Sequence, residues 1–280
     1  MHQQMANALA IPNRTVGLIY ASGPTDTYIL SYPDGNLINS FQTGRPPSIC
    51  SNDKGQVFIP ESEKLLKYKH GGAKPIATLN DKGFEPEGCA ADATSGSLAV
   101  TNFRSTSFGP GNVALYANGS NKPNFLADPS ITNYYFCSYD DLGNLFVTGT
   151  SSSKSFLMAE LRKGSSTFTD ITVNGAISAA GMVQWDGTYL ALGTNINTKI
   201  YRVAVSGSTG TVVSTTTLFN VGHPTYSFFV SEGYVIAPTG RYGNRLGFWR
   251  YPKGGKRVNA VGPLYEKHQP VTGITVSKAS

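Results

Sequence analysis

The side chains best suited to chemistry in this sequence lie in short segments that precede apolar runs. They include the acid pair Glu85 and Glu87, the histidines His223 and His268, and Arg45. Glu87 or a histidine could serve as a general base, and Arg45 could hold an anion. Because alternate residues of an extended segment point to the same side, Glu85 and Glu87 share one side. The pattern predicts a polar pocket, provided that the fold brings these segments together.

Aromatic residues precede other apolar runs in the same way. The candidate ligand-binding residues are Arg45, Glu85, Tyr134, Tyr135, Tyr226, Phe103 and Arg104, and the candidate catalytic residues are Glu87, His223 and His268. Prolines stand beside several of them, so these positions also fit loop residues whose turns proline fixes. Phe103 and Arg104 belong to a Ser-, Gly- and Pro-containing stretch, 102–112, for which we expect a long loop that forms a lid or a contact surface.

A turn followed by an apolar strand recurs along the chain. Examples are NDKGQVFIP at 52–60, YDDLGNLFV at 139–147 and SEGYVIA at 231–237. The turn glycines of five such units, 41, 47, 44 and 46 residues apart, are Gly55, Gly96, Gly143, Gly187 and Gly233. This period is typical of a β-propeller, in which each blade is a four-stranded sheet.

A second element, an apolar stretch that runs into a polar or glycine turn, occurs six times, as in YILSYPDG at 28–35 and LGFWRYPKGG at 246–255. The first unit lacks its opening turn, and 273–276 at the other end resembles the strand that precedes the turns. We therefore expect an all-β, six-bladed propeller with four-stranded blades, closed by pairing of the N- and C-terminal strands. Closure leaves no long exposed sheet edge. The expected boundaries are a flexible segment at 1–15 and one domain at 16–280, and a generic all-β sandwich is the alternative.

The composition restricts the class of protein. Only 14% of residues are charged, against roughly a quarter in an average soluble chain, while 40% are hydrophobic, too many for a disordered chain. The net charge of +6 is scattered rather than gathered into a stripe, so we expect no nucleic-acid partner. No apolar run approaches the length of a membrane span.

The three cysteines, Cys50, Cys89 and Cys137, precede successive repeat turns. Their placement predicts small buried residues packed between neighbouring sheets. One bridge between two of them is the alternative, but it would need Cα atoms within about 7 Å, and inner strands of neighbouring blades are usually farther apart. An odd number of cysteines also argues against a complete disulfide framework.

The unit that contains Pro86-Glu87-Gly88-Cys89-Ala90-Ala91-Asp92 resembles the NHL-repeat propellers and the related gluconolactonase and senescence-marker-protein family. In lactonase members, residues just before the repeat glycine point into the central channel and hold a divalent metal. The resemblance implies that Glu87, with Asn102 as a further oxygen ligand, would hold calcium or another divalent cation. Among the positions equivalent to Glu87, this sequence has no second carboxylate, whereas a calcium site needs several oxygen ligands.

The function expected from these observations is recognition of a small molecule, a glycan or a protein at the channel mouth and its loops. The alternative is a metal-dependent hydrolase of a lactone or ester. We expect a monomer without a membrane span. By analogy with similar propellers, which the low charge and the Ser, Thr and Gly content fit, we also expect a bacterial protein exported to the periplasm or the extracellular space. Residues 1–10 have no signal-peptide pattern, so the export signal would be absent from this sequence.

Overall fold

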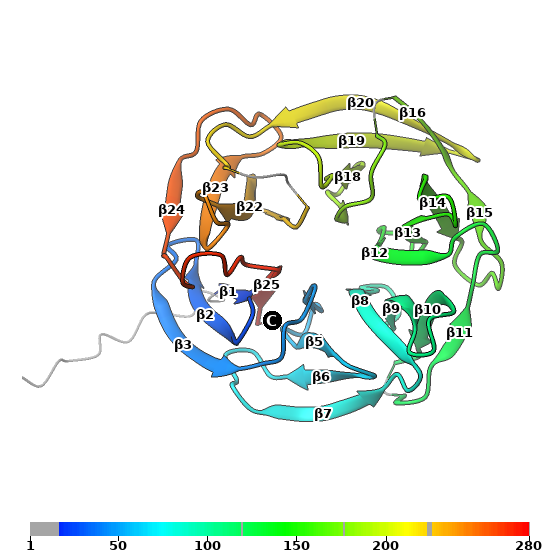
Figure 1. The fold of residues 1–280 in the computed structure, drawn as a ribbon, viewed down its shortest axis with the longest axis horizontal. Coiled ribbons are helices and arrows are strands. Elements are labelled where there is room, and N and C mark those ends of the chain that lie inside the picture. The colour runs from blue at the N-terminus through cyan, green and yellow to red at the C-terminus, as the bar shows by residue number, and fades with distance from the viewer. Residues whose placement is uncertain (1–16, 119, 176, 223–225, 280) are drawn as a thin grey trace, which may run out of the picture.

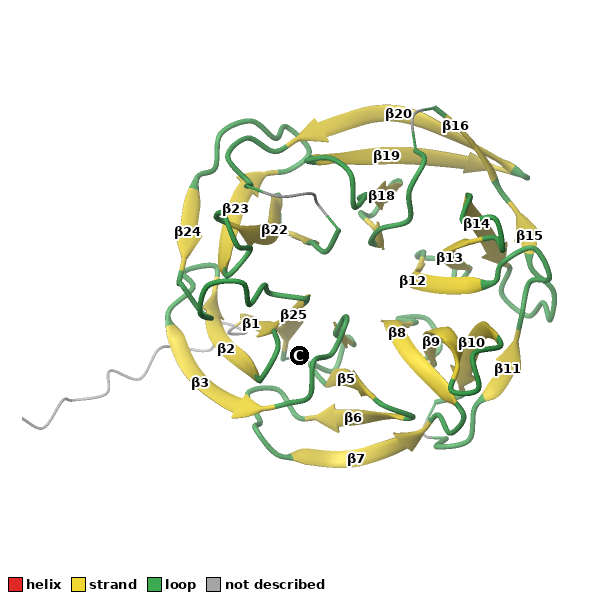
Figure 2. Cartoon of the chain, in the orientation of Figure 1, coloured by secondary structure: helices red, strands yellow, loops and turns green. Residues whose placement is uncertain are grey.

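The fold is a ring of six β-sheets around a central channel, as the computed structural model shows (Figures 1 and 2). The structure describes residues 17–118, 120–175, 177–222 and 226–279. All regular elements within these ranges are strands, which confirms the six-bladed propeller. No helix in the described ranges is long and apolar enough to cross a membrane. The expected flexible segment at 1–15 lies outside the described residues.

We number the blades in chain order, starting from the sheet that joins the two ends. Blade 1 contains β25 (Gly273–Lys278), β1 (Gly17–Ser22), β2 (Asp26–Tyr32) and β3 (Leu37–Gln42). Blade 2 contains β4 (Cys50–Ser51), β5 (Val57–Glu61), β6 (Lys64–Tyr68) and β7 (Pro75–Asn80). Blade 3 contains β8 (Phe84–Ala91), β9 (Leu98–Ser105), β10 (Pro110–Tyr116) and β11 (Asn124–Leu126).

The other half of the ring repeats this order with one addition. Blade 4 contains β12 (Asn133–Tyr139), β13 (Leu145–Thr150), β14 (Phe156–Leu161) and β15 (Thr169–Asp170). Blade 5 contains β17 (Val183–Trp185), β18 (Leu190–Leu192), β19 (Lys199–Ser206) and β20 (Thr209–Thr217), and β16 (Thr172–Asn174) pairs in parallel with β20 as a fifth strand. Blade 6 contains β21 (Phe229–Ser231), β22 (Tyr234–Thr239), β23 (Arg245–Arg250) and β24 (Asn259–Val261).

The strands in the middle of each blade are buried on both faces. In β5, Val57, Phe58 and Ile59 are each at most 6% exposed, although consecutive residues point to opposite faces. Each blade therefore packs against a neighbour on either side. The outer strand β3 contrasts with them, because five of its six residues are exposed.

The closing strand β25 joins the two ends of the chain, as predicted. It pairs antiparallel with β1 from Gly17–Lys278 to Ser22–Gly273. It also contacts blade 2, where Thr275 shares a 2.9 Å hydrogen bond with Ser51. On the other side Lys278 forms a 2.8 Å ion pair with Glu232 of blade 6. The last strand therefore connects three blades.

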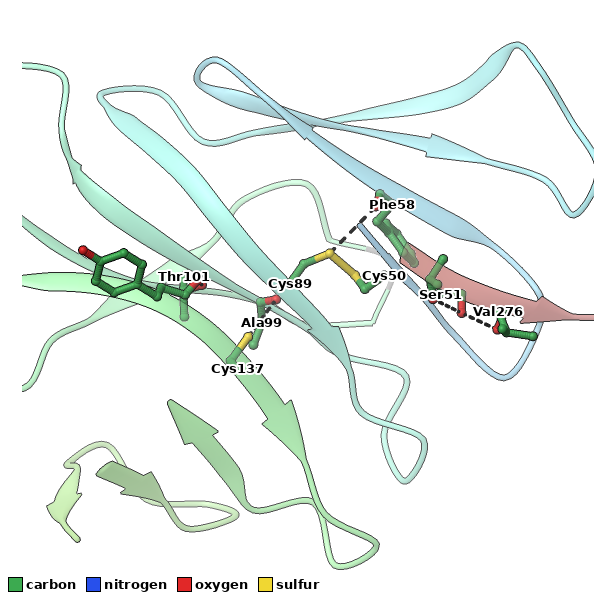
Figure 3. The surroundings of a disulfide bond; sticks show 10 residues. Cys50, Ser51, Phe58, Cys89, Ala99, Thr101, Cys137 and Val276 are labelled. Atoms are coloured by element: carbon green, nitrogen blue, oxygen red, sulfur yellow. Dashed lines mark hydrogen bonds between the residues drawn. A yellow bond between two sulfur atoms is a disulfide. The ribbon is translucent and has the colours of Figure 1, made fainter. Parts of the chain in front are cut away.

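Two of the three cysteines form a disulfide, so the expectation of three unpaired thiols is wrong. Cys50 of β4 and Cys89 of β8 are bonded, with Cα atoms 5.7 Å apart, and join the innermost strands of blades 2 and 3 (Figure 3). Cys137 of β12 is a buried free thiol, as expected.

The direction of each cysteine explains the bond. Cys50 lies two residues before the β-turn that starts at Asn52, whereas Cys137 lies three before the turn at Asp140. Cys89 shares the register of Cys137, and both contact the preceding blade, where Cys89 Sγ lies 3.8 Å from the Phe58 carbonyl. Because side chains alternate across a strand, Cys50 faces the following blade and meets Cys89.

Candidate functional site

A pocket of about 540 Å³ lies at the end of the channel where the inner strands begin. Its walls are built by the start of β8, by segments that connect the outer strand of one blade to the inner strand of the next, and by one residue of β22. The lining residues are Arg45, Pro47, Glu85, Pro86, Glu87, Tyr226, Ser227, Pro238, Pro270, Val271 and Thr272. We call this cavity the mouth pocket.

The ring geometry brings four candidate residues from the sequence to this pocket. Arg45 lies between β3 and β4, Glu85 and Glu87 lie on β8, and Tyr226 lies just before β21. All inner strands run in the same direction relative to the channel, so their starting ends meet at one mouth. Proline at four lining positions reduces the conformations open to these segments.

Glu87 and Tyr226 meet across the channel. The Tyr226 hydroxyl donates a 3.1 Å hydrogen bond to Glu87 Oε1, and blades 3 and 6 stand opposite each other in the ring (Figure 1). The Tyr226 ring also packs edge-on against Phe136 of blade 4, with centroids 5.0 Å apart. The tyrosine side chain therefore forms part of the pocket floor and fixes the direction of the carboxyl group.

Burial changes the protonation of this pair. Removal from water, opposed by the hydrogen bond from Tyr226 and aided by the charge of Glu85, raises the pKa of Glu87 to about 7. Burial and the neighbouring Glu87 also raise the pKa of Tyr226, so its hydroxyl stays protonated. The same two causes, in the same order, raise the pKa of Tyr135. Near neutral pH Glu87 can therefore exist as an acid or as a carboxylate.

The second acid of the pocket is paired. Arg104 of β9 forms a 2.8 Å ion pair with Glu85, and its guanidinium lies over the rings of Phe103 and Phe108, 5.7 and 4.6 Å from their centroids. These residues do not form the expected long loop at 102–112. Strands β9 and β10 continue through most of it, from the Arg104–Pro110 pair to the Tyr116–Leu98 pair, and only 106–109 turns.

The other candidate residues that the structure describes are not among the lining residues of the mouth pocket. Tyr134 is fully buried between blades, where its hydroxyl donates to the carbonyl of Asp128. His268 is exposed and stacks on Tyr242 with centroids 4.3 Å apart. His223 lies outside the described residues. Tyr135 packs edge-on against Phe103, 5.4 Å between centroids.

The side chains do not fit the divalent cation implied by the resemblance. Asn102 is fully buried, and its Nδ2 donates to Asn112 Oδ1 at 2.8 Å and to Asp81 Oδ1 at 3.3 Å. The Glu87 carboxyl accepts a hydrogen bond from Tyr226. Within the described ranges, no three acidic, histidine or cysteine side chains come together as metal ligands do.

The sequence did not predict two features, a proline in the lining of the mouth pocket and a buried carboxyl beside Asn102. Pro238 lies inside β22, opposite Leu246, and contributes to the pocket from the second strand of its blade. The carboxyl of Asp81 is fully buried beside Asn102, and its Oδ2 has no hydrogen-bond partner among the described residues. A proline within an apolar strand could have marked the first position, because proline interrupts a strand ladder. No sequence signal distinguished Asp81 from an ordinary turn residue.

Comparison with known proteins supports the architecture. No protein-family model matches the sequence, and a search of curated proteins finds no match. A chain in the crystal structure of a nidogen/laminin complex is similar in structure, with a TM-score of 0.68, 12% identity, and coverage of 94% of this chain and 98% of that one. A protein of unknown function from Bacteroides caccae has a TM-score of 0.67, 10% identity, and coverage of 94% and 99%. Both similarities show the fold, and neither establishes the NHL or gluconolactonase type.

Proposed function

We propose that the protein is a recognition module that binds a small organic acid in the mouth pocket. The observation that carries the proposal is the charge arrangement of this pocket. Glu85 is neutralised by Arg104, and Glu87 is bonded to Tyr226. Arg45 lines the same pocket and has no ion-pair partner in the described part of the chain. It is therefore available to a ligand carboxylate.

The shape of the site supports a small ligand over a macromolecule. A volume of about 540 Å³ is in the range of small-molecule pockets, and its proline and valine lining suits an apolar ligand body. One structural neighbour belongs to a protein complex, that of nidogen and laminin, and a glycan or protein partner for this chain is an alternative outcome of the test below.

The test measures binding of matched pairs of ligands, each a carboxylic acid and its neutral amide, by isothermal titration calorimetry. We expect acids to bind more tightly than amides, and Arg45→Gln to weaken acid binding about tenfold or more. Arg241→Gln is the control, because Arg241 belongs to the β22–β23 connection and does not line the pocket. Equal affinity for acids and amides, or retention of affinity in Arg45→Gln, would contradict the proposal.

The pH dependence provides a second test. Protonation of Glu87, whose pKa is raised to about 7, removes a negative charge from the pocket. Acid ligands should therefore bind more tightly as the pH falls from 8 to 6, since an ordinary ligand carboxylate stays ionised there. Glu87→Gln should bind them with little pH dependence over the same range. A wild-type affinity that does not change with pH would argue against a role for Glu87.

We also propose that the protein works in an oxidising compartment, outside the cytosol. The Cys50–Cys89 disulfide supports this location, because disulfides persist mainly in exported proteins. Thiol titration of the denatured protein, isolated from its native compartment without reductant, should find one free thiol, that of Cys137. Three free thiols would contradict the proposal.

A further inference from the structure

A second cavity lies on the opposite face of the ring, between blades 2 and 3. Its volume is about 190 Å³. The turn that joins β4 to β5 forms one wall with Phe58 and Lys67, and Gly96, Leu98 and Asn118 belong to the other wall. We call this cavity the interblade crevice. It shares no lining residue with the mouth pocket.

Two lysines give the interblade crevice a positive charge. Lys54 and Lys67 both line it, and neither has a carboxylate within 4.0 Å among the described residues. Lys67 is half-buried, and its ammonium lies 5.7 Å from the centre of the Phe58 ring. Burial, and then the charge of Lys54, lower the pKa of Lys67. The two lysines therefore repel each other without a compensating protein anion.

Asp53 also lines the interblade crevice but does not compensate the lysines. Asp53 is exposed, and it also lines a separate cavity at the end of the channel opposite the mouth pocket. It forms no ion pair with either lysine. An anion placed between Lys54 and Lys67 would thus meet two cations and one solvent-screened acid.

Neutral hydrogen-bond donors complete the lining. Asn52 donates from Nδ2 to Gln56 Oε1 at 3.0 Å, and its Oδ1 accepts the Gln56 backbone N–H at 2.8 Å. This pairing occupies the oxygen of the Gln56 amide, and Nε2 has no hydrogen-bond partner among the described residues. Asn118 approaches Gly96 so closely that a Cβ at Gly96 would lie 3.1 Å from Asn118 Nδ2. The side-chain amides of Gln56 and Asn118 therefore line the same crevice as the two lysines.

The disulfide fixes the two walls relative to each other. Cys50 lies two residues before the turn at 52–55, and Cys89 lies on β8, whose hairpin partner β9 begins at Leu98 (Figure 3). The carbonyl of Phe58 lies next to Cys89 Sγ, so a residue of the crevice wall touches the bridge. A site whose walls are held in place loses less conformational entropy when a ligand binds.

We propose that the interblade crevice binds a tetrahedral oxyanion, a sulfate or phosphate group, either free or as the ester group of a small molecule. Lys54 and Lys67 supply the charge, and the Gln56 and Asn118 amides donate hydrogen bonds to the oxygens. Charge-assisted hydrogen bonds to an oxyanion are strong in such a partly enclosed site. A cavity of about 190 Å³ accommodates the oxyanion and a few further atoms but not a large ligand.

The experiment is calorimetric titration of the full chain with sodium sulfate, sodium phosphate, glucose 6-sulfate and glucose 6-phosphate, at low and constant ionic strength. We expect saturable binding of at least one of these ions with a stoichiometry of one. Tighter binding of an ester than of its inorganic ion would identify the esterified form as the ligand, and the reverse order would identify the free ion. Lys67→Gln and Lys54→Gln should each weaken binding about tenfold or more.

Lys154→Gln is the matched control, because it makes the same charge change at an exposed position in the β13–β14 turn, away from the crevice. It should leave the affinity within about twofold of wild type. The double variant Cys50→Ala/Cys89→Ala should bind the ion more weakly while retaining Lys54 and Lys67. No saturable binding of any of the four compounds, or an equal loss in all three lysine variants, would overturn the proposal.

Discussion

At the scale of single residues, Asp81 has the most unusual environment of the acids described. Its side chain is fully buried beside Asn102 and Tyr116, and burial raises its pKa from 3.8 to about 6. The hydrogen bond from Asn102 and the nearby Tyr116 hydroxyl only partly oppose the shift. A buried acceptor without a donor costs roughly 1–3 kcal/mol, and both Asp81 Oδ2 and Asn102 Oδ1 lack one among the described residues.

Replacing Asp81 with Asn should stabilise the protein at high pH. A raised native pKa adds stability that is complete below the unfolded value of 3.8 and is lost as the pH rises through about 6. The wild type should therefore lose about 1.4 kcal/mol between pH 5 and pH 8 through this group, and the variant should not. Urea unfolding of both proteins at the two pH values measures the difference. The titration of Glu87 contributes equally to both unfolding free energies, because both proteins contain it. A stability difference independent of pH would contradict this assignment.

The element that departs most from the sequence-based expectation is β4, the shortest inner strand of the ring, because its Cys50 forms a disulfide. The repeat placed three cysteines before three turns, and that much is correct. Counting from each turn would have shown that Cys50 is one residue out of register with Cys89 and Cys137. Since strand side chains alternate, this single-residue offset turns Cys50 toward the next blade and permits the bond.

The disulfide should contribute to stability through the closed loop. Cys50 and Cys89 are 39 residues apart, for which loop-closure entropy gives about 4 kcal/mol. Cys50→Ala/Cys89→Ala should lower the free energy of unfolding by an amount of that order, measured in urea. Reductant should lower the stability of wild type and leave the double variant unchanged. Cys137→Ala is the control, and it should stay sensitive to reductant; an insensitive wild type would contradict a stabilising role for the bond.

The whole ring shows which features a sequence can reveal. The strands, the turns and the terminal pairing follow local patterns repeated about every 45 residues, so they could be predicted from the chain alone. The contact of Glu87 with Tyr226 depends on two blades that meet only after closure. The burial of Asp81 and the interblade crevice depend on how neighbouring sheets pack. No local pattern encodes these distances, although the repeat did place Arg45, Glu85, Glu87 and Tyr226 at one mouth.

The low charge of the chain has a structural reason at this scale. With 14% charged residues, the protein has few ionisable side chains to place, and the central strands of its blades have no solvent-facing side. In β13, for example, five of six residues are buried. Uncharged hydroxyl groups supply hydrogen bonds in the turns instead, as in the serine cluster of the β13–β14 turn.

Closure of the ring depends on β25, and its removal tests this dependence. A chain ending at Thr272 would expose the edge of β1 and lose the contacts of Thr275 with blade 2 and of Lys278 with blade 6. Ile274, 1% exposed, would also leave the core. Exposed strand edges favour association, so we expect this truncated protein to unfold at lower urea concentration and to form oligomers in size-exclusion chromatography.

A synthetic peptide covering 271–280 should restore the monomeric, more stable form when added in excess, and the same peptide with Ile274→Lys should not. A truncated protein as stable and monomeric as the full chain would show that the other five blades hold the ring without its closing strand.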